Sequence, residues 1–201
     1  MRFAHFVWLL SITCLPISET CGEQNQSVPG ITKAFNLTDV HGQVHQLGPT
    51  SQRTALVVVL LSTECPISNS YITLLNQRSQ EWSKNDLQID FLGFVSDRTL
   101  SRQAALKHSE EFDLKFPVIF DGSGELASLL QPTHTPEAFV LNSKGEIVYR
   151  GRIDNLCSEV GKRRQTPTTH DLQEAVTSLI KGQPVKVAYQ NRSAVFMKPR
   201  N

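Results

Sequence analysis

The sequence predicts an α/β protein in which helices flank a central mixed β-sheet and a β-hairpin precedes that sheet. The run Thr54–Leu61 is apolar on both faces and rich in β-branched residues, as a strand buried inside a sheet is. Strand-like and helix-like segments then alternate, which is typical of βαβ units. A length of 201 residues, 39% hydrophobic and 19% charged, indicates a globular chain with one core.

The charge balance excludes one broad class of partner. The chain has 20 Lys and Arg residues against 19 Asp and Glu residues, so its formal net charge is +1. Nucleic-acid binding draws much of its affinity from an excess of basic side chains over the phosphates. Because no such excess is present, nucleic acid is not an expected partner.

Residues 1–24 have the order of a secretory signal peptide, in which a positively charged end precedes an apolar run. That run is too short to cross a bilayer, so no integral membrane span is expected. The alternative is an uncleaved helix, which Pro16 would end. Export places the protein in the periplasm or outside the cell, where thiols meet oxidising conditions. Cleavage beyond Cys21 leaves Cys65 and Cys157 as the cysteines of the mature chain.

A polar linker over residues 25–30 leads into a domain predicted over residues 31–184. Residues 34–38 alternate like a half-buried strand, and residues 43–47 return after a turn to complete the opening hairpin. The central strand Thr54–Leu61 comes next. Beyond it the chain turns at Cys65, and apolar residues at helical spacing continue as far as Trp82.

The second half repeats the alternation. We expect strands at 89–95, 116–121, 138–141 and 146–150, and helices at 99–112, 124–130 and 171–181. Asn142–Gly145 forms the turn of the last hairpin, and Gly182 with Pro184 ends the last helix. Residues 185–201 form a C-terminal tail to which no task is assigned.

Cys65 is the first candidate for chemistry. It follows a buried strand directly and stands at the first turn of a helix, where unpaired amides and the partial positive charge of the helix favour thiolate over thiol. Pro66 suits this turn, and Ser68 could donate a hydrogen bond to the sulfur. The alternative is that Cys65 is a small buried core residue without reactivity.

A second loop, Pro132–Ala138, gives a reason to prefer the reactive interpretation. The strand, the Cys65-Pro66-Ile67-Ser68 motif at a helix start, and the Thr135-Pro136 pair before a strand and hairpin together resemble the thioredoxin-like fold, in its redoxin (alkyl hydroperoxide reductase/thiol-specific antioxidant) branch of the secreted bacterial type. The resemblance implies that Pro136 is a cis-proline lying against the active-site sulfur. It also implies that the backbone of Thr135 pairs with an extended substrate. The alternative is a trans-proline that simply begins a strand.

The motif departs from that of thioredoxins, which have a second cysteine where this chain has Ser68. Cys65 therefore has no local partner, and a mixed disulfide on it must be resolved from elsewhere. Cys157, in the polar loop Asn155–Gln165, is the other cysteine of the domain and the candidate for that step. The alternative is a surface thiol in a flexible loop.

Peroxiredoxins share the Cys-Pro pair but carry a proline and a threonine before the reactive cysteine, where this chain has Val58 and Ser62. They also place an arginine beside the sulfur from the strand that corresponds to 138–141, and that strand has none here. Arg150 or Arg152 could replace it only if the fold brings one of them near the sulfur; otherwise each is a solvated or paired surface charge.

Carboxylates and histidines complete the candidates. Glu137 adjoins the expected cis-proline and could move a proton to or from the leaving thiol, although a glutamate at a strand start often only faces water. His134 could approach Cys65 as in copper-binding thioredoxin-like proteins, but those use a cysteine pair that this chain lacks. No cofactor and no metal are therefore expected.

Three functions remain open on the sequence. The first is an exported thiol oxidoreductase in which Cys65 attacks a protein or small-molecule disulfide beside Pro136, with an external thiol reductant or Cys157 completing the cycle. The second is an antioxidant peroxidase in which a hydroperoxide oxidises Cys65 to a sulfenic acid. The third is a non-catalytic thioredoxin-like module that binds a partner or delivers a metal.

Overall fold

The computed structural model of this chain describes residues 30–84, 87–159 and 162–185. The predicted signal peptide, most of the linker and nearly all of the predicted C-terminal tail lie outside these residues. No helix in the described part of the chain is long and apolar enough to cross a membrane.

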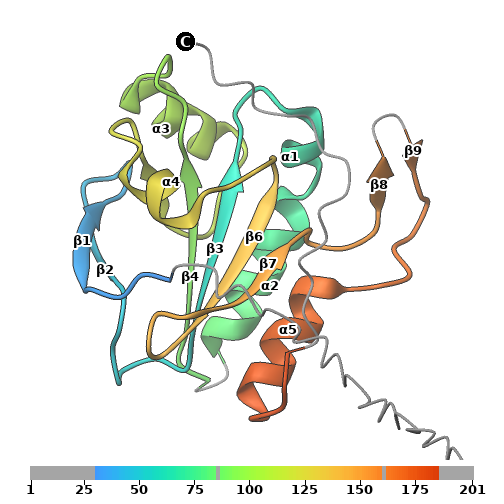
Figure 1. Cartoon of the computed structure of the whole chain (residues 1–201). Coiled ribbons are helices and arrows are strands. Elements are labelled where there is room, and N and C mark those ends of the chain that lie inside the picture. The colour runs from blue at the N-terminus through green and yellow to red at the C-terminus, as the bar shows by residue number, and fades with distance from the viewer. Residues whose placement is uncertain (1–29, 85–86, 160–161, 186–201) are drawn as a thin grey trace, which may run out of the picture.

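A five-stranded mixed sheet forms the centre of the molecule, with the strand order β5-β4-β3-β6-β7 (Figure 1). β3 pairs in parallel with β4 and antiparallel with β6, so it lies in the middle of the sheet. All seven residues of β3 are buried, which explains why the sequence there is apolar on both faces. The strand bounds are β3 Ala55–Leu61, β4 Ile89–Val95, β5 Val118–Phe120, β6 Glu137–Asn142 and β7 Ile147–Gly151.

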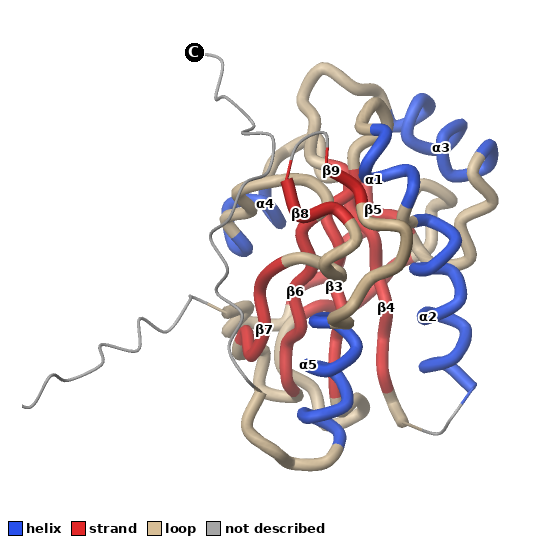
Figure 2. The backbone as a smooth tube through the Cα atoms, turned by 90° about the vertical axis from the view of Figure 1, so that its right-hand side faces the viewer, coloured by secondary structure: helices blue, strands red, loops and turns tan. Residues whose placement is uncertain are grey.

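Helices cover both faces of this sheet because successive residues of β3 point to opposite sides. Val57 and Val59 pack in one core cluster with Leu75 of α2 and Val176 of α5, and Figure 2 shows these two helices along the sheet. Alternate residues of β3 pack on the other face with α4 and the N-terminal hairpin. The helix bounds are α1 Pro66–Ser70, α2 Ile72–Lys84, α3 Arg102–Glu111, α4 Glu125–Leu130 and α5 Asp171–Ile180.

The structure contains the N-terminal hairpin that the alternating pattern of residues 34–38 and 43–47 predicted. β1 (Phe35–Thr38) pairs antiparallel with β2 (Val44–Leu47) in a separate two-stranded sheet. Leu47 is fully buried against the central sheet, whereas Val44 is 66% exposed. The hairpin therefore covers one face of the core with one side of its strands.

Two details differ from the sequence-based expectation. The helix after Cys65 is interrupted at Tyr71, which separates α1 from α2. The segment expected to be a polar loop around Cys157 contains two short antiparallel strands, β8 (Cys157–Glu159) and β9 (Lys162–Arg163). These strands lack the apolar alternation on which strand prediction depends, so they could not be predicted from the local pattern.

Candidate active site

Cys65 stands where the central strand passes into a helix. β3 ends at Leu61, and Cys65 is the N-cap of α1 with an extended backbone (φ −86°, ψ 112°). Pro66 occupies the first turn of α1, where a missing amide hydrogen costs nothing. The Cys65 carbonyl accepts the first helical hydrogen bond from the amide of Asn69 over 3.0 Å. The Cys65 thiol is half-buried and is not in a disulfide. A nucleophilic thiol needs both properties, because a substrate must be able to reach it.

The loop between β3 and Cys65 is held by side chains of α1. The hydroxyl oxygen of Ser68 accepts from the amide of Ser62 over 3.1 Å, and Ser68 is only 1% exposed. The side-chain amide of Asn69 donates to the carbonyl of Thr63 over 3.2 Å. The Ser68 hydroxyl still has its own proton to donate, so the predicted bond to the Cys65 sulfur stays a prediction.

A histidine from a distant helix supports this loop through Asn69. The Nε2 atom of His108, in α3, lies 3.0 Å from the Oδ1 atom of Asn69, which makes the ring the donor to that amide oxygen. Burial lowers the pKa of His108 below the ordinary value of 6.5. Sequence reasoning missed both residues because nothing in their local pattern separates them from ordinary helix residues.

The Thr135–Pro136 peptide bond is cis, as the resemblance implied. In the β3–β6 register Glu137 is the partner of Leu60, so Pro136 comes level with the end of β3. The loop that carries Cys65 leaves the sheet at the same end. The sheet therefore brings the two predicted halves of the site, Cys65 and the Thr135-Pro136 pair, to the end at which β3 finishes and β6 begins.

Glu137 holds the loop that precedes the cis-proline. Its carboxylate is 2% exposed and accepts from the Nε of Arg150 over 2.7 Å and from the amide of Thr133 over 2.6 Å. The Arg150 guanidinium lies over the ring of Phe139 at 5.5 Å and also donates to the carbonyl of Gln131. These contacts give Glu137 a structural role that the sequence did not indicate, and its predicted role in proton transfer stays a prediction.

The two other charged candidates have partners in the structure. His134 lies 3.7 Å from the Glu137 carboxylate, and burial lowers its pKa although the negative charge of Glu137 opposes this. Arg152 pairs with Asp171 over 2.9 Å. In the described part of the chain, no group of three His, Cys, Asp or Glu side chains comes together as a metal ion would need.

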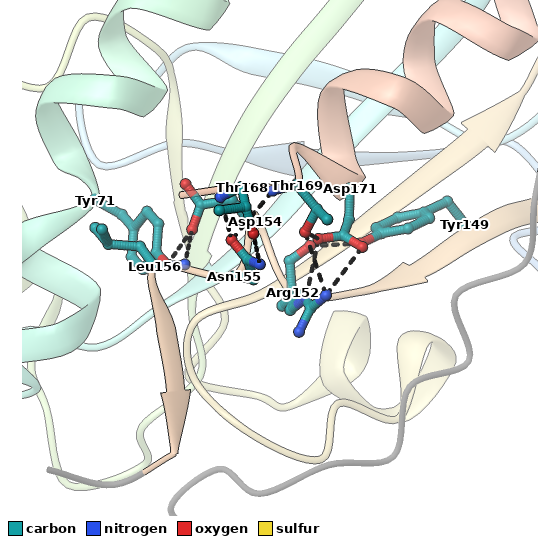
Figure 3. A network of polar contacts seen from close by, with 9 residues as sticks. All are labelled: Tyr71, Tyr149, Arg152, Asp154, Asn155, Leu156, Thr168, Thr169 and Asp171. Atoms are coloured by element: carbon teal, nitrogen blue, oxygen red, sulfur yellow. Dashed lines mark hydrogen bonds and ion pairs between the residues drawn. The ribbon is translucent and has the colours of Figure 1, made fainter. Parts of the chain in front are cut away.

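Cys157 is half-buried at the start of β8, beside the turn between α1 and α2. Its backbone lies near the hydroxyl of Tyr71, which donates to Asp154 over 2.5 Å. Figure 3 shows Tyr71 directed at Asp154, with Leu156 beside them. The structure thus brings the Cys157 segment against the helix that begins at Cys65, which sequence separation alone could not indicate.

With this geometry described, the family can be identified. The profile of the Redoxin family matches residues 23–162. The chain belongs to the Redoxin family. This redoxin has no match among curated proteins.

Solved structures share the thioredoxin-like fold of this redoxin. It is similar to an uncharacterized conserved protein from Geobacillus kaustophilus at 23% identity, covering 88% of this chain and 96% of that chain with a TM-score of 0.69. It is similar to StoA from Bacillus subtilis at 18% identity, covering 61% and 89% of the two chains with a TM-score of 0.53. It is also similar to a thiol-disulfide oxidoreductase from Bacteroides fragilis at 20% identity, covering 62% and 91% with a TM-score of 0.52. At these identities the likeness establishes the fold.

Proposed function

We propose that this redoxin is an exported thiol-disulfide oxidoreductase whose nucleophile is Cys65. The observation that carries the proposal is the arrangement at one edge of the sheet, where a half-buried free cysteine begins α1 and the cis-proline Pro136 precedes β6. The thiolate is the form of a cysteine that attacks disulfides, and the half-buried position of Cys65 lets a substrate reach it. Membership of the Redoxin family and structural neighbours named as thiol-disulfide oxidoreductases support the same chemistry.

The first chemical step is attack of the Cys65 thiolate on one sulfur of a protein or small-molecule disulfide. A bond forms between Cys65 and that sulfur, the substrate S–S bond breaks, and the other substrate sulfur leaves as a thiolate that takes up a proton. The resemblance to redoxins supports pairing of the Thr135 backbone with an extended substrate segment beside Pro136. The Thr135 hydroxyl is buried and has no hydrogen-bond partner among the described residues, so a polar group of the substrate could satisfy it.

The second step releases the substrate. A thiol attacks the mixed disulfide on Cys65, and the second substrate sulfur leaves as a thiol. If Cys157 is that thiol, the protein ends with a Cys65–Cys157 disulfide, which an external thiol reductant must reduce. If an external thiol attacks the Cys65 sulfur instead, Cys65 forms a mixed disulfide with that thiol. A second external thiol then breaks this bond, which gives an external disulfide and the free Cys65 thiol, and Cys157 takes no part. The contact between the Cys157 segment and Tyr71 supports the first route.

A hydroperoxide reductase is the weaker alternative. Arg150 forms an ion pair with Glu137, and Arg152 forms one with Asp171. Both candidate arginines are therefore paired charges, which was the alternative to a place beside the Cys65 sulfur. These arginine contacts support attack on disulfide sulfur over attack on peroxide oxygen.

The test compares Cys65→Ser with the unchanged protein and with Cys157→Ser. We expect Cys65→Ser to lose reduction of a disulfide-bonded peptide by at least a hundredfold, because the proposal assigns the first attack to the Cys65 thiolate. Cys157→Ser should still form the mixed disulfide and should turn over only when external thiol is added. An unchanged reduction rate in Cys65→Ser would refute the proposal.

The same preparations discriminate the alternative functions. Stopped-flow oxidation by hydrogen peroxide should be no faster for Cys65 than for free cysteine, whereas a much faster reaction would favour the peroxidase. A binding module would retain its partner in Cys65→Ser and would show no turnover with either substrate.

A further inference from the structure

A buried tyrosine links the two cysteine-bearing segments. Tyr71 lies on the turn between α1 and α2 and is 4% exposed. Its hydroxyl donates to Oδ1 of Asp154, and the same carboxylate oxygen accepts from the amide of Leu156, the residue before Cys157. Through Asp154 the phenol therefore joins the helix that begins at Cys65 to the strand that begins at Cys157.

The other end of this link is fixed by further bonds (Figure 3). Oδ1 of Asp154 also accepts from the amide of Leu156 over 2.8 Å, and the Asp154 side chain is 2% exposed. The next residue, Asn155, exchanges hydrogen bonds with Thr168 and accepts one from the amide of Thr169, just before α5. The Cys157 segment is thereby anchored toward α5 on one side and to Tyr71 on the other.

We propose that Tyr71 is a positioning residue that holds Cys157 for the second step of disulfide exchange. This inference rests on the proposed function, in which Cys157 attacks the mixed disulfide on Cys65. In that step the Cys157 thiol loses its proton to solvent, a bond forms between the two cysteine sulfurs, and the substrate sulfur leaves as a thiolate that is then protonated. The two cysteines are oxidised to a disulfide while the substrate disulfide is reduced to two thiols.

Intramolecular attack depends on how often the two sulfurs meet in a productive arrangement. The hydrogen bond from Tyr71 to Asp154, whose carboxylate also accepts from Leu156, restricts the Cys157 segment to the neighbourhood of the Cys65 helix. Burial and the hydrogen bond to Asp154 raise the pKa of Tyr71 above its ordinary value of 10.0, so the phenol keeps its proton near neutral pH. The protonated hydroxyl can then donate to Asp154.

Single-turnover kinetics of Tyr71→Phe test this role, because phenylalanine keeps the buried ring and removes only the hydroxyl. Reduced protein is mixed with a disulfide-bonded peptide, quenched with acid at intervals, and analysed by mass spectrometry for the mixed disulfide and for the Cys65–Cys157 disulfide. We expect formation of the internal disulfide to slow about tenfold. The first step, attack by Cys65, should stay within twofold of the unchanged protein.

Tyr149→Phe is the matched control. Tyr149 is 2% exposed, and its hydroxyl donates to the carbonyl of Arg152, away from Cys157. Both steps should keep their rates in this variant. Asp154→Asn is a second variant that keeps an acceptor oxygen but removes the charge, and we expect it to slow the internal disulfide two- to fivefold.

The outcomes separate this inference from the function on which it rests. An internal disulfide that forms at the unchanged rate in both Tyr71→Phe and Asp154→Asn would overturn the role of Tyr71 and leave the proposed function standing. A protein that completes exchange without any Cys65–Cys157 disulfide would overturn both the resolving role of Cys157 and this inference. In a Cys157→Ser background, Tyr71→Phe should have no effect on turnover with external thiol, and a tenfold loss there would assign Tyr71 to Cys65 instead.

Discussion

At the scale of single residues, the ion pair between Glu137 and Arg150 organises the loop that presents the cis-proline. Both side chains are at least 93% buried, and Glu137 also accepts from the amide of Thr133. A buried carboxylate is stable only when cations and donors surround it, because its removal from water is costly. The position of Thr135 and Pro136 therefore depends on Arg150, which is far from them along the chain.

Replacement of Arg150 by methionine should destabilise the protein strongly. Methionine fills a similar volume but leaves Glu137 buried without its cation, which we expect to lower the free energy of unfolding by about 3–5 kcal/mol. Urea denaturation measures this difference. Lys107→Met is the control, because Lys107 is 72% exposed in its ion pair with Glu111 and should contribute less than about 1 kcal/mol. Equal costs for the two variants would contradict the assigned role of Arg150.

At the scale of elements, the turn between β6 and β7 determines where the β6–β7 hairpin contacts the first residues of the domain. Gly145 has φ +78°, and its carbonyl accepts from the amide of Ile31 over 2.9 Å. A Cβ atom at this position would lie 2.1 Å from the carbonyl oxygen of Ile31. The turn thus needs glycine both for its backbone angle and for the close approach of another chain segment.

Gly145→Ala should be much more destabilising than Gly182→Ala. Gly182 also has a positive φ, of +64°, but nothing lies within 4 Å of its would-be Cβ. We expect about 1 kcal/mol for Gly182→Ala, from backbone strain alone, and about 3 kcal/mol or more for Gly145→Ala, where a backbone collision is added. Thermal and urea unfolding of the two variants check the difference. Similar costs would mean that the segment at Ile31 yields without penalty.

The break between α1 and α2 is a second feature at this scale. Tyr71 ends α1 with its amide bonded to Ser68, and the amide of Leu75 bonds back to the carbonyl of Tyr71 as α2 begins. The interruption turns the Tyr71 ring into the core, where its hydroxyl reaches Asp154. The helical spacing of apolar residues continues through this break, which is why the sequence predicted one helix.

At the scale of the whole molecule, one buried histidine and one half-buried histidine make stability depend on pH. Burial lowers the pKa of His108 and of His134 below the ordinary value of 6.5. Because the unfolded chain then binds more protons than the folded protein as pH falls through this value, acidification favours unfolding. The two carboxylates with lowered pKa, Asp39 and Asp97, titrate below 3.8 and so act outside this window.

We expect the free energy of unfolding to fall between about pH 7 and pH 5.5, by less than about 1.4 kcal/mol per pH unit for each histidine. His108→Gln should reduce this slope, because glutamine does not titrate, yet its amide can still donate to Asn69. Urea denaturation over this pH range measures both slopes. A free energy of unfolding that rises on acidification would contradict the prediction.

The sequence determined the local elements and their order. The uninterrupted apolar run of β3, the alternation in the first hairpin and the glycine of the last turn each have a physical cause within a few residues, so each could be predicted. The position of Cys65 at a helix start and its pairing with the Thr135-Pro136 motif also followed from the sequence, through the resemblance to redoxins. The helix boundaries shifted by a few residues because capping depends on neighbours that periodicity does not report.

The tertiary structure decided which distant residues meet. Glu137 and Arg150 lie on neighbouring strands β6 and β7, His108 reaches Asn69 from α3, and Tyr71 meets Asp154 across a separation of 83 residues. Each contact depends on the order of strands in the sheet and on the packing of helices over it. The same local sequence pattern is compatible with several strand orders and several helix packings. Buried polar groups require partners because burial removes water, but only the folded arrangement determines which partner each one finds.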